Sequence, residues 1–360
     1  MSAAIDFRPV ILAGGSGTRF WPRSRKRSAK QVLNVVGERS LIQATVERLA
    51  PVIPPEHLWI LTNHHLRDEI VRQLPEIPPS QVLAEPAQRN TAPAIGLAAH
   101  ILHAADPEAV MGVFPADHVI SKPSVYRAVL RAGLKGAAAG HLMVVGIQPR
   151  WPETGYGYIE FPRGTAPGVA TPLVVKRFHE KPVLAKARRY LAAGNYYWNS
   201  GMFFWRAGVL LDQLRLYLPK TATILASLPP VASTRFASQL AHSFPRCDNI
   251  SIDYAVLERA SIVRGIAAGD FGWNDVGSWN AVYELLGRDA SGNVLPRDSF
   301  VLDAHNNFVD ARGKAIALLG VDDLIVVDTA DALLVARRDR AQEVGDIVKA
   351  LEKANRHDLL

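Results

Sequence analysis

Short apolar runs alternate with longer amphipathic segments through the first half of the chain, and this alternation restricts the possible folds most strongly. The runs have the length and composition of buried strands, and the segments between them have the apolar spacing of helices. The predicted strands are Pro9–Ala13, Leu58–Thr62, Gln81–Ala84, Val110–Pro115 and Leu142–Gly146, and the predicted helices are Ser40–Ala50, His65–Gln73, Ala92–Ala104 and Ser124–Ala139. The pattern predicts a parallel α/β sheet with both faces covered.

A glycine-rich loop follows the first predicted strand, in the run VILAGGSGTR from Val10 to Arg19. Such a loop exposes backbone N–H groups to phosphate oxygens, and glycine lets a ligand approach the backbone closely. Ligands of parallel α/β sheets bind at the carboxyl ends of the strands, where this loop lies. Further cations follow at Arg23, Arg25, Lys26, Arg27 and Lys30. A rigid anion cradle beside mobile positive charge suits a nucleoside triphosphate.

Two common glycine-loop motifs do not fit this run. The dinucleotide-binding fingerprint needs glycine or alanine where the chain has Phe20, and a Walker A loop needs a Gly-Lys-Ser/Thr that is missing here. An ordinary turn between a strand and a helix is therefore the alternative for the two glycines alone, although the neighbouring cations favour a phosphate site.

The chain of 360 residues carries a formal net charge of +7. A basic balance favours nucleotides, nucleic acids or anionic membranes as partners. Because the cations form no long run and no basic tract is interleaved with aromatic residues, nucleotides and sugar phosphates fit better than nucleic acid.

Cys247 is the only cysteine, so no disulfide can form within the chain, as expected in a reducing compartment. A lone cysteine is more often a small buried side chain than a catalytic thiol. Asp6 and Arg8 interrupt the N-terminal apolar run, unlike a signal peptide. No apolar stretch reaches the roughly 18 residues of a membrane span. We expect a soluble, cytoplasmic protein.

The pattern changes in the second half. Strands are predicted at Tyr156–Phe161 and Leu173–His179 and a helix at Lys181–Ala193. After residue 285, short apolar segments separated by turn residues are typical of a small β domain or a short β-helix. These segments are Phe300–Leu302, Asn307–Val309, Ala315–Leu319, Leu324–Val327 and Ala332–Val335, and Gln342–Ala354 closes the chain as a helix. We expect two domains, residues 1–285 and 286–360.

Two acidic residues are candidate magnesium ligands. Asp117 follows a predicted buried strand, and Asp275 lies between two tryptophans in the run FGWNDVGSW. Magnesium usually takes one or two carboxylates together with substrate phosphates. The alternative for each acid is to cap the helix that follows it.

Three other polar segments are candidate binding loops. Glu180-Lys181-Pro182 places a lysine after a strand, where it could bind a phosphate, although proline also favours a plain helix start. Asn199 and its neighbours could bind sugar hydroxyls or form a simple turn. The segment Glu85–Ala92 could bind a base, or Thr91 could only cap the next helix. The eleven histidines are scattered, and no nucleophile elbow or zinc pattern occurs.

Together these segments resemble the sugar-1-phosphate nucleotidyltransferases, in particular the branch that guanylylates mannose 1-phosphate. The resemblance covers essentially the whole chain, and the order of its motifs makes it specific. It rests on Gly14–Pro22, Lys30-Gln31, Phe114–His118, Glu180–Pro182, Trp198–Gly201, Ser251–Ala255 and Trp273–Trp279. The chain departs from the family at Phe20, where leucine is usual, and at Ala29, where a proline usually precedes the lysine; the second change could loosen the Lys30 loop.

The resemblance implies a Rossmann-like (GT-A-like) core with a mixed sheet, followed by a small C-terminal domain resembling a short left-handed β-helix that ends in a helix. It implies that GMP passes from GTP to mannose 1-phosphate, giving GDP-mannose and pyrophosphate, with Mg²⁺ as cofactor and a homodimer as one expectation. Two alternatives remain, a guanylyltransferase for another sugar 1-phosphate such as a heptose and a non-catalytic regulatory homologue.

The resemblance also implies roles for individual residues. Arg19, Lys30, Asp117, Lys181 and Asp275 are the expected catalytic residues, with Asp117 and Asp275 as the metal ligands. The expected nucleotide-binding residues are Leu12, Ala13, Gly14, Gly15, Ser16, Gly17, Thr18, Glu85, Asn90 and Thr91. The expected sugar-phosphate-binding residues are Gly157, Glu180, Lys181 and Asn199.

Overall fold

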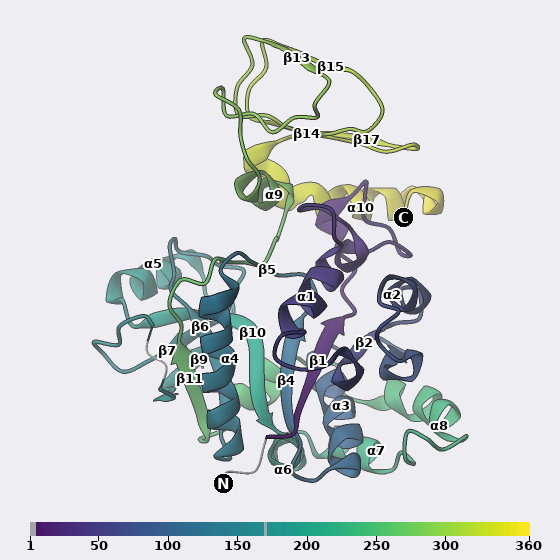
Figure 1. The fold of residues 1–360 in the computed structure, drawn as a ribbon, viewed down its shortest axis with the longest axis vertical. Coiled ribbons are helices and arrows are strands. Elements are labelled where there is room, and N and C mark those ends of the chain that lie inside the picture. Colours follow the sequence, from purple (N-terminus) through teal and green to yellow (C-terminus); the bar gives the residue numbers. More distant parts are fainter. Residues whose placement is uncertain (1–4, 169–170) are drawn as a thin grey trace.

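A computed structural model describes residues 5–168 and 171–360 and shows a large α/β unit below a smaller β unit (Figure 1). A mixed sheet of ten described strands forms the centre of the large unit, in the order β3-β2-β1-β4-β10-β6-β11-β8, with β7 paired to β10 and β9 paired to β7. Its strands are β1 (Phe7–Ala13), β2 (Trp59–Asn63), β3 (Val82–Glu85), β4 (Val110–Pro115), β6 (Leu142–Ile147), β7 (Tyr158–Glu160), β8 (Leu173–Val174), β9 (Arg177–His179), β10 (Tyr196–Arg206) and β11 (Val263–Ala267).

The N-terminal strands pair as the alternating pattern predicts. β1 lies parallel to both β2 and β4, and β2 lies parallel to β3. Nearly every residue of β4 and β6 is buried, because a sheet covered on both faces needs strands that are apolar throughout. The long strand β10 enters antiparallel between β4 and β6, which makes the sheet mixed, as the family resemblance implies.

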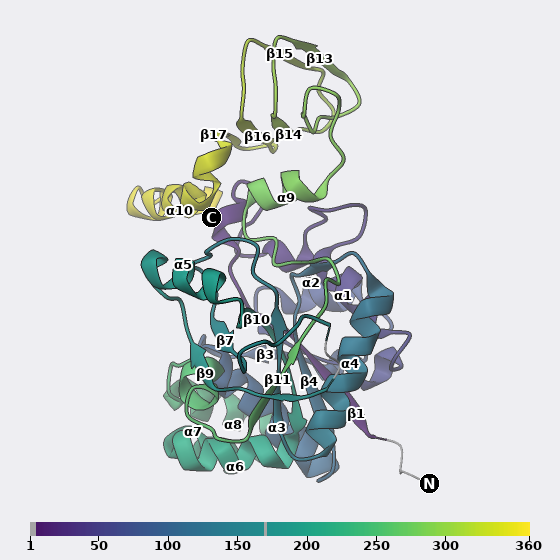
Figure 2. The same ribbon diagram turned by 90° about the vertical axis from the view of Figure 1, so that its left-hand side faces the viewer.

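Helices cover both faces of this sheet (Figure 2). Residues of α1 (Leu41–Leu49), α2 (Arg67–Gln73) and α4 (Pro123–Ala138) share one apolar cluster with the sheet, and residues of α3 (Thr91–Ala105) and α6 (Ala207–Tyr217) share the other. The remaining helices of this unit are α5 (Leu184–Ala193), α7 (Pro219–Ala226), α8 (Phe236–Ser243) and α9 (Trp279–Leu285). Cys247 is buried in a small cluster with α7 and α8, in agreement with a packing role.

The C-terminal unit is like a β-helix and ends in a helix, as predicted. Its strands are β13 (Ser299–Leu302), β14 (Phe308–Asp310), β15 (Ile316–Leu319), β16 (Leu324–Asp328) and β17 (Leu333–Arg337), and α10 (Val344–Lys353) closes it. β13 lies parallel to β15, and β14 lies parallel to β16. Apolar residues of this unit share a cluster with Phe20 and Trp279 of the large unit.

Several predicted boundaries are wrong. The predicted strand Leu173–His179 is broken into β8 and β9, which pair with different neighbours. The predicted helix Lys181–Ala193 begins only at Leu184, because Lys181 has a positive φ of 44° that a helix excludes. The predicted helix Gln342–Ala354 begins as a 3-10 turn, Arg338–Glu343, and α10 follows it. Among residues 5–168 and 171–360, no helix has the length and apolarity needed to cross a membrane.

Close packing between α4 and the sheet gives a testable prediction. A Cβ at Gly133 would lie 2.5 Å from the Phe204 ring. We expect Gly133→Ala to destabilise the protein, because overpacking costs about 1–3 kcal/mol and outweighs the gain of about 1 kcal/mol in helix propensity. Gly287→Ala is the matched control, since its Cβ would meet nothing within 4 Å. Thermal unfolding measures both variants, and equal melting temperatures would contradict the packing argument.

Candidate active site

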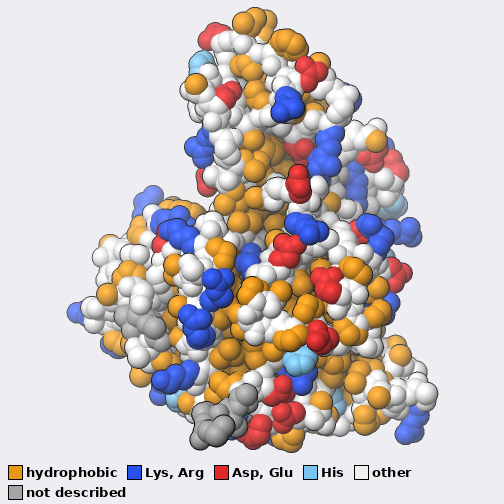
Figure 3. Space-filling model, in the orientation of Figure 1, with side chains coloured by type: hydrophobic (Ala, Val, Ile, Leu, Met, Phe, Trp, Pro, Cys, Tyr) orange, Lys and Arg blue, Asp and Glu red, His pale blue; other side chains and the backbone are white. Residues whose placement is uncertain are grey.

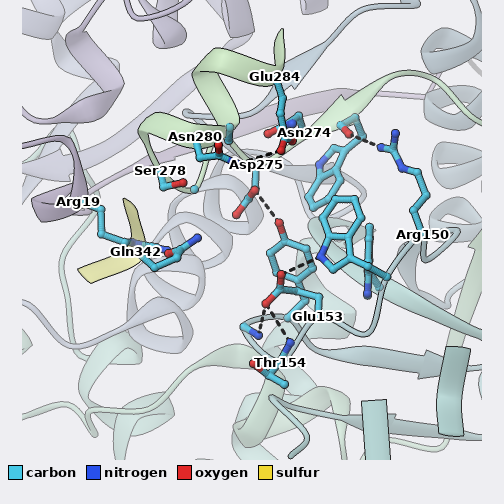
Figure 4. A pocket seen from close by; sticks show the side chains of 17 residues that line it. Arg19, Arg150, Glu153, Thr154, Asn274, Asp275, Ser278, Asn280, Glu284 and Gln342 are labelled. Atoms are coloured by element: carbon cyan, nitrogen blue, oxygen red, sulfur yellow. Dashed lines mark hydrogen bonds between the residues drawn. The ribbon is translucent and has the colours of Figure 1, made fainter. Parts of the chain in front are cut away.

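Two cavities lie at the carboxyl end of the central strands. The glycine-loop cavity, of about 480 Å³, is lined by residues that include Gly14, Gly15, Glu85, Asn90 and Asp117. The Asp275 cavity, of about 600 Å³, is lined by residues that include Tyr156 and Trp198. Arg19, Asp275 and Gln342 also line it and are labelled in the close view of Figure 4. The predicted nucleotide-binding residues Leu12 and Thr91 also line the first cavity.

The ammonium group of Lys30 joins the two predicted metal ligands. Lys30 is 5% exposed, and its Nζ donates to Asp117 Oδ2 at 2.9 Å and to the backbone oxygen of Asp275 at 2.6 Å. Burial alone would raise the pKa of Asp117, but the positive charge and hydrogen bond of Lys30, with the neighbouring His118, lower it below its usual range. Asp117 is therefore ionised at neutral pH.

The departures Phe20 and Ala29 do not disrupt this arrangement. The φ of Ala29 is −72°, close to the value that proline would fix, so the backbone before Lys30 keeps that conformation. The buried Phe20 ring lies 5.5 Å from Lys30 Nζ and 5.0 Å from the Trp279 ring, between ring centroids. An aromatic face attracts a cation, so Phe20 adds a contact to Lys30 that leucine could not make.

The glycine loop packs against the segment that carries Lys30. Gly17 has φ +60°, and a Cβ there would lie 2.7 Å from Lys30 Cβ. Glycine is required at this position both for its backbone conformation and for this close approach. Ser24 Oγ donates to the oxygen of Ser16 at 2.9 Å. The loop leads from β1 into a short 3-10 turn, Thr18–Phe20, rather than directly into an α-helix.

Neither predicted metal ligand caps a helix. The next helix after Asp117 is α4, whose N-cap is Lys122, and the N-cap of α9 is Ser278, so both capping alternatives are wrong. The Tyr156 hydroxyl donates to Asp275 Oδ1 at 2.6 Å. Burial and the charge of Asp275 raise the pKa of Tyr156, so the phenol keeps its proton. The next residue, Val276, has φ +48°, a strained value for a β-branched side chain.

The two acids fit magnesium better than a metal with only protein ligands. The described residues contain no group of three or more His, Cys, Asp or Glu side chains suited to a metal ion. Asp117 and Asp275 both contact Lys30 and border the two cavities. Two carboxylates beside space for phosphates match the way magnesium binds in nucleotide sites.

His118 is a neutral packing residue next to Asp117. Its Nδ1 accepts from Trp273 Nε1 at 3.2 Å, and the two rings meet edge to face. Burial lowers the pKa of His118 to about 4. The imidazole is therefore uncharged at neutral pH, and its Nδ1 is occupied by the indole donor.

Glu85, Asn90 and Thr91 line the glycine-loop cavity. Asn90, with φ +62°, is the N-cap of α3, so the hypothesis that Thr91 is the cap is wrong. The Thr91 hydroxyl instead accepts from the Ile252 N–H at 2.9 Å. Glu85 ends β3, and burial raises its pKa to about 7. The glycine-loop cavity thus has a weakly acidic carboxyl group beside Gly14.

The predicted sugar-phosphate residues form a second cluster. Asn199 lies in an irregular part of β10 rather than in a turn, and its N–H donates to the Gly157 oxygen at 2.8 Å. A Cβ at Gly157 would overlap the Glu180 carboxylate, so a side chain there would displace that carboxylate from its present position. Lys181 Nζ lies 3.2 Å from Glu180 Oε1. Because Tyr156 precedes Gly157 in the chain, this cluster adjoins Asp275.

Asp253 belongs to the same cluster, although the sequence analysis gave it no role. Its Oδ1 accepts from Asn199 Nδ2 at 2.9 Å. Burial, followed by the negative charge of Glu180, raises the pKa of Asp253 to about 7. The only sequence signal was that Ser251–Ala255 is one of the segments that resemble the family.

Comparison with known proteins agrees with this architecture. Residues 8–291 match the family described as "Nucleotidyl transferase", and residues 298–351 match the "MannoseP isomerase/GMP-like beta-helix domain". Since the first match spans more than half of the chain, the protein is a nucleotidyltransferase.

Individual relatives show which family of nucleotidyltransferases the chain belongs to. Mannose-1-phosphate guanylyltransferase of Escherichia coli is 40% identical over 97% of this chain and 74% of that protein, and the Klebsiella pneumoniae protein of the same name is 39% identical over 97% and 75%. A Thermus thermophilus crystal structure described as a mannose-1-phosphate geranyltransferase superimposes with a TM-score of 0.86, at 32% identity, over 97% of this chain and 100% of that one. The chain belongs to the mannose-1-phosphate guanylyltransferase family.

The raised pKa of Asp253 predicts a pH-dependent stability. The folded value of about 7 lies above the unfolded value of about 3.9, so ionisation destabilises the fold as the pH rises from about 4 to 7. Asp253→Asn keeps the acceptor for Asn199 but cannot ionise. We expect its melting temperature to exceed that of the unmodified protein by about 3 °C or more at pH 8 and to match it at pH 4.

Thermal melts from pH 4 to 8 measure this difference. Asp68→Asn is the control, because it removes the same charge from a side chain that is 95% exposed. A constant offset between Asp253→Asn and the unmodified protein at every pH would contradict the assignment of a buried, protonated Asp253.

Proposed function

We propose that the chain transfers GMP from GTP to α-D-mannose 1-phosphate and releases GDP-mannose and pyrophosphate. The observation that carries the proposal is the Lys30 ammonium held between Asp117, which lines the glycine-loop cavity, and Asp275, which lines the second cavity. Relatives that are about 40% identical and named for this activity support the choice of substrates.

The reaction needs charge neutralisation more than proton transfer. An oxygen of the sugar phosphate attacks the α-phosphorus of GTP in line, and the bond to the leaving pyrophosphate breaks. A phosphate monoester has a second pKa near 6, so the attacking oxygen is already largely ionised at neutral pH. No general base is required, in keeping with the neutral, indole-bonded His118. Positioning and electrostatic stabilisation supply most of the catalysis in phosphoryl transfer.

The glycine loop is the proposed triphosphate cradle. Leu12 and Ala13 end β1, and the N–H groups of Gly14–Thr18 follow them. Arg19 and Lys30 would neutralise the β- and γ-phosphates as pyrophosphate leaves. The Glu85 carboxyl group, with Asn90 and Thr91, would contact guanine and ribose, since guanine presents N–H donors that a carboxylate accepts.

The second cluster is the proposed sugar-phosphate site. Lys181 would bind the phosphate of mannose 1-phosphate as a point charge, and its 61% exposed side chain leaves it free to turn toward an anion. Glu180 and Asn199 would contact sugar hydroxyl groups. Gly157 would leave room for the ligand beside Glu180, because any side chain there would overlap the carboxylate.

Asp117 and Asp275 are the proposed magnesium ligands. When bound, Mg²⁺ would withdraw negative charge from the α-phosphate and so favour attack by a second anion. Lys30 keeps Asp117 ionised, and Tyr156 orients the Asp275 carboxylate through its hydroxyl. Both effects prepare oxygen ligands without requiring a third acidic side chain.

We also propose that residues 1–285 form a catalytic domain and residues 286–360 form a C-terminal domain. We further propose that two copies of the chain associate through the C-terminal domain as a homodimer. β13 and β15 lie at the tip of the molecule (Figure 1), where the surface view shows hydrophobic side chains (Figure 3). These strands carry Phe300, Leu302 and Leu319, which are 66%, 68% and 73% exposed. Leu302 and Leu319 are register partners, so the apolar side chains are contiguous. Exposed apolar patches of this kind mark association surfaces, and sedimentation velocity would reveal a dimer.

A substrate panel tests the proposed reaction. We expect GTP with mannose 1-phosphate to exceed every other pair, because unpaired buried polar groups can discriminate against the wrong base by ~10⁴ or more. Selection of mannose 1-phosphate over glucose 1-phosphate should be weaker than selection of the base, because the two sugars differ only in the orientation of one hydroxyl group. Release of pyrophosphate measures turnover. Preference for UTP, dTTP or a heptose phosphate would contradict the proposal, and inactivity with all pairs would favour a regulatory homologue.

Replacing Asp275 tests the metal assignment. Asp275→Asn keeps the size and one acceptor oxygen for Tyr156 but removes the charge. We expect turnover at saturating Mg²⁺ to fall about a hundredfold or more, the scale of losing one electrostatic stabiliser, and the melting temperature to change little. Asp270→Asn is a control, because Asp270 is exposed and pairs with Lys122. Near-normal turnover of Asp275→Asn would contradict the metal role.

A further inference from the structure

The C-terminal segment Arg338–Leu360 packs against the turn that follows the glycine loop. Val344 and Val348 of this segment share an apolar cluster with Phe20 and Trp21. Trp21 Nε1 donates to the Leu359 oxygen at 3.0 Å, across 338 residues of sequence. The C-terminal domain is therefore fixed to the backbone from which Arg19 projects.

The same segment reaches the side chain of Arg19. Arg19 Nη1 donates to Gln342 Oε1, and both residues line the Asp275 cavity side by side (Figure 4). Gly345 also lies close to this turn, because a Cβ there would make ordinary van der Waals contacts, 3.5 Å from Thr18 Oγ1 and 3.7 Å from Arg19 Cγ. One wall of the cavity is thus formed by the C-terminal domain.

We infer that Gln342 is a positioning residue that aims the Arg19 guanidinium at the β- and γ-phosphates of the nucleotide, so that the C-terminal domain completes the triphosphate site of the same chain. This inference rests on the proposed function, in which Arg19 neutralises the leaving pyrophosphate.

The chemistry of Gln342 suits positioning rather than neutralisation. A guanidinium group has five N–H donors in a fixed fork, and Gln342 engages only Nη1. An amide oxygen orients the group but leaves its positive charge intact for phosphate. The adjacent Glu343, which would neutralise that charge, is instead hydrogen-bonded to Arg340. The segment therefore presents its neutral acceptor to Arg19 and turns its carboxylate away.

Binding of inorganic pyrophosphate, measured by calorimetry, tests the inference without requiring turnover. Gln342→Met keeps the length of the side chain but lacks the acceptor, and we expect its affinity for pyrophosphate to fall roughly threefold. Gln342→Glu pairs with Arg19 and competes with phosphate, so its affinity should fall roughly tenfold. Glu343→Gln is the matched control on the same turn and should bind as the unmodified protein does.

Steady-state kinetics provide a second test, because loss of a merely structural contact would not change the KM for GTP selectively. We expect the KM for GTP to rise roughly threefold in Gln342→Met and roughly tenfold in Gln342→Glu. The KM for mannose 1-phosphate should stay unchanged in both variants. In an Arg19→Ala background, Gln342→Met should have no further effect on pyrophosphate binding, because coupled residues are not additive.

Three outcomes would overturn the inference: unchanged pyrophosphate affinity in both Gln342 variants, an equal rise in both KM values, or a full effect of Gln342→Met in the absence of Arg19. Failure of the proposed function would look different. The unmodified protein would then make no GDP-mannose from GTP and mannose 1-phosphate, while its pyrophosphate affinity would still report on the contact between Arg19 and Gln342.

Discussion

The buried ammonium group of Lys30 is the interaction on which the rest of this site depends. It lies between the Asp117 carboxylate and the backbone oxygen of Asp275, in a position from which water is largely excluded. A buried charge without partners is costly, so the strands and loops that carry these two acids must meet at this point. The same contact keeps Asp117 ionised, which the proposed magnesium site requires. The ion pair between Lys30 and Asp117 therefore both satisfies a buried charge and keeps a proposed magnesium ligand ionised.

Three residues at or next to predicted site positions adopt strained backbone conformations. Asn90, Lys181 and Val276 all have positive φ values, and each is a predicted site residue or the neighbour of one. Such conformations persist only where the surrounding structure holds them. Here the Asn90 cap on α3, the Glu180–Lys181 pair and the hydrogen bond from the Val276 N–H to Asn274 Oδ1 do so. The chain therefore leaves regular helix or strand geometry at or next to predicted site residues.

The two units of the chain contribute to one site through different kinds of contact. The α/β unit supplies the glycine loop, Asp117, Asp275 and the cluster around Asn199, all at the carboxyl edge of one sheet. The β unit adds Gln342 beside Arg19, and the ion pair between Arg23 and Asp310 strengthens the junction at 2.6 Å. An apolar cluster that includes Phe20 and Trp279 fills the space between them. The proposed chemistry therefore depends on packing between domains as well as within one.

The sequence by itself determined the sheet strands from β1 to β4, the glycine loop and the C-terminal β unit, because apolar periodicity and glycine placement are local signals. It also identified Lys30, Asp117 and Asp275 through motif order, although no local rule says that they touch. Only the tertiary structure decided that Asn90 rather than Thr91 caps α3, that Asp253 joins Asn199, and that Gln342 reaches Arg19. The contacts of Asp253 and Gln342 link residues far apart in the chain, and packing of the sheet and the C-terminal unit, rather than local preference, brings them together.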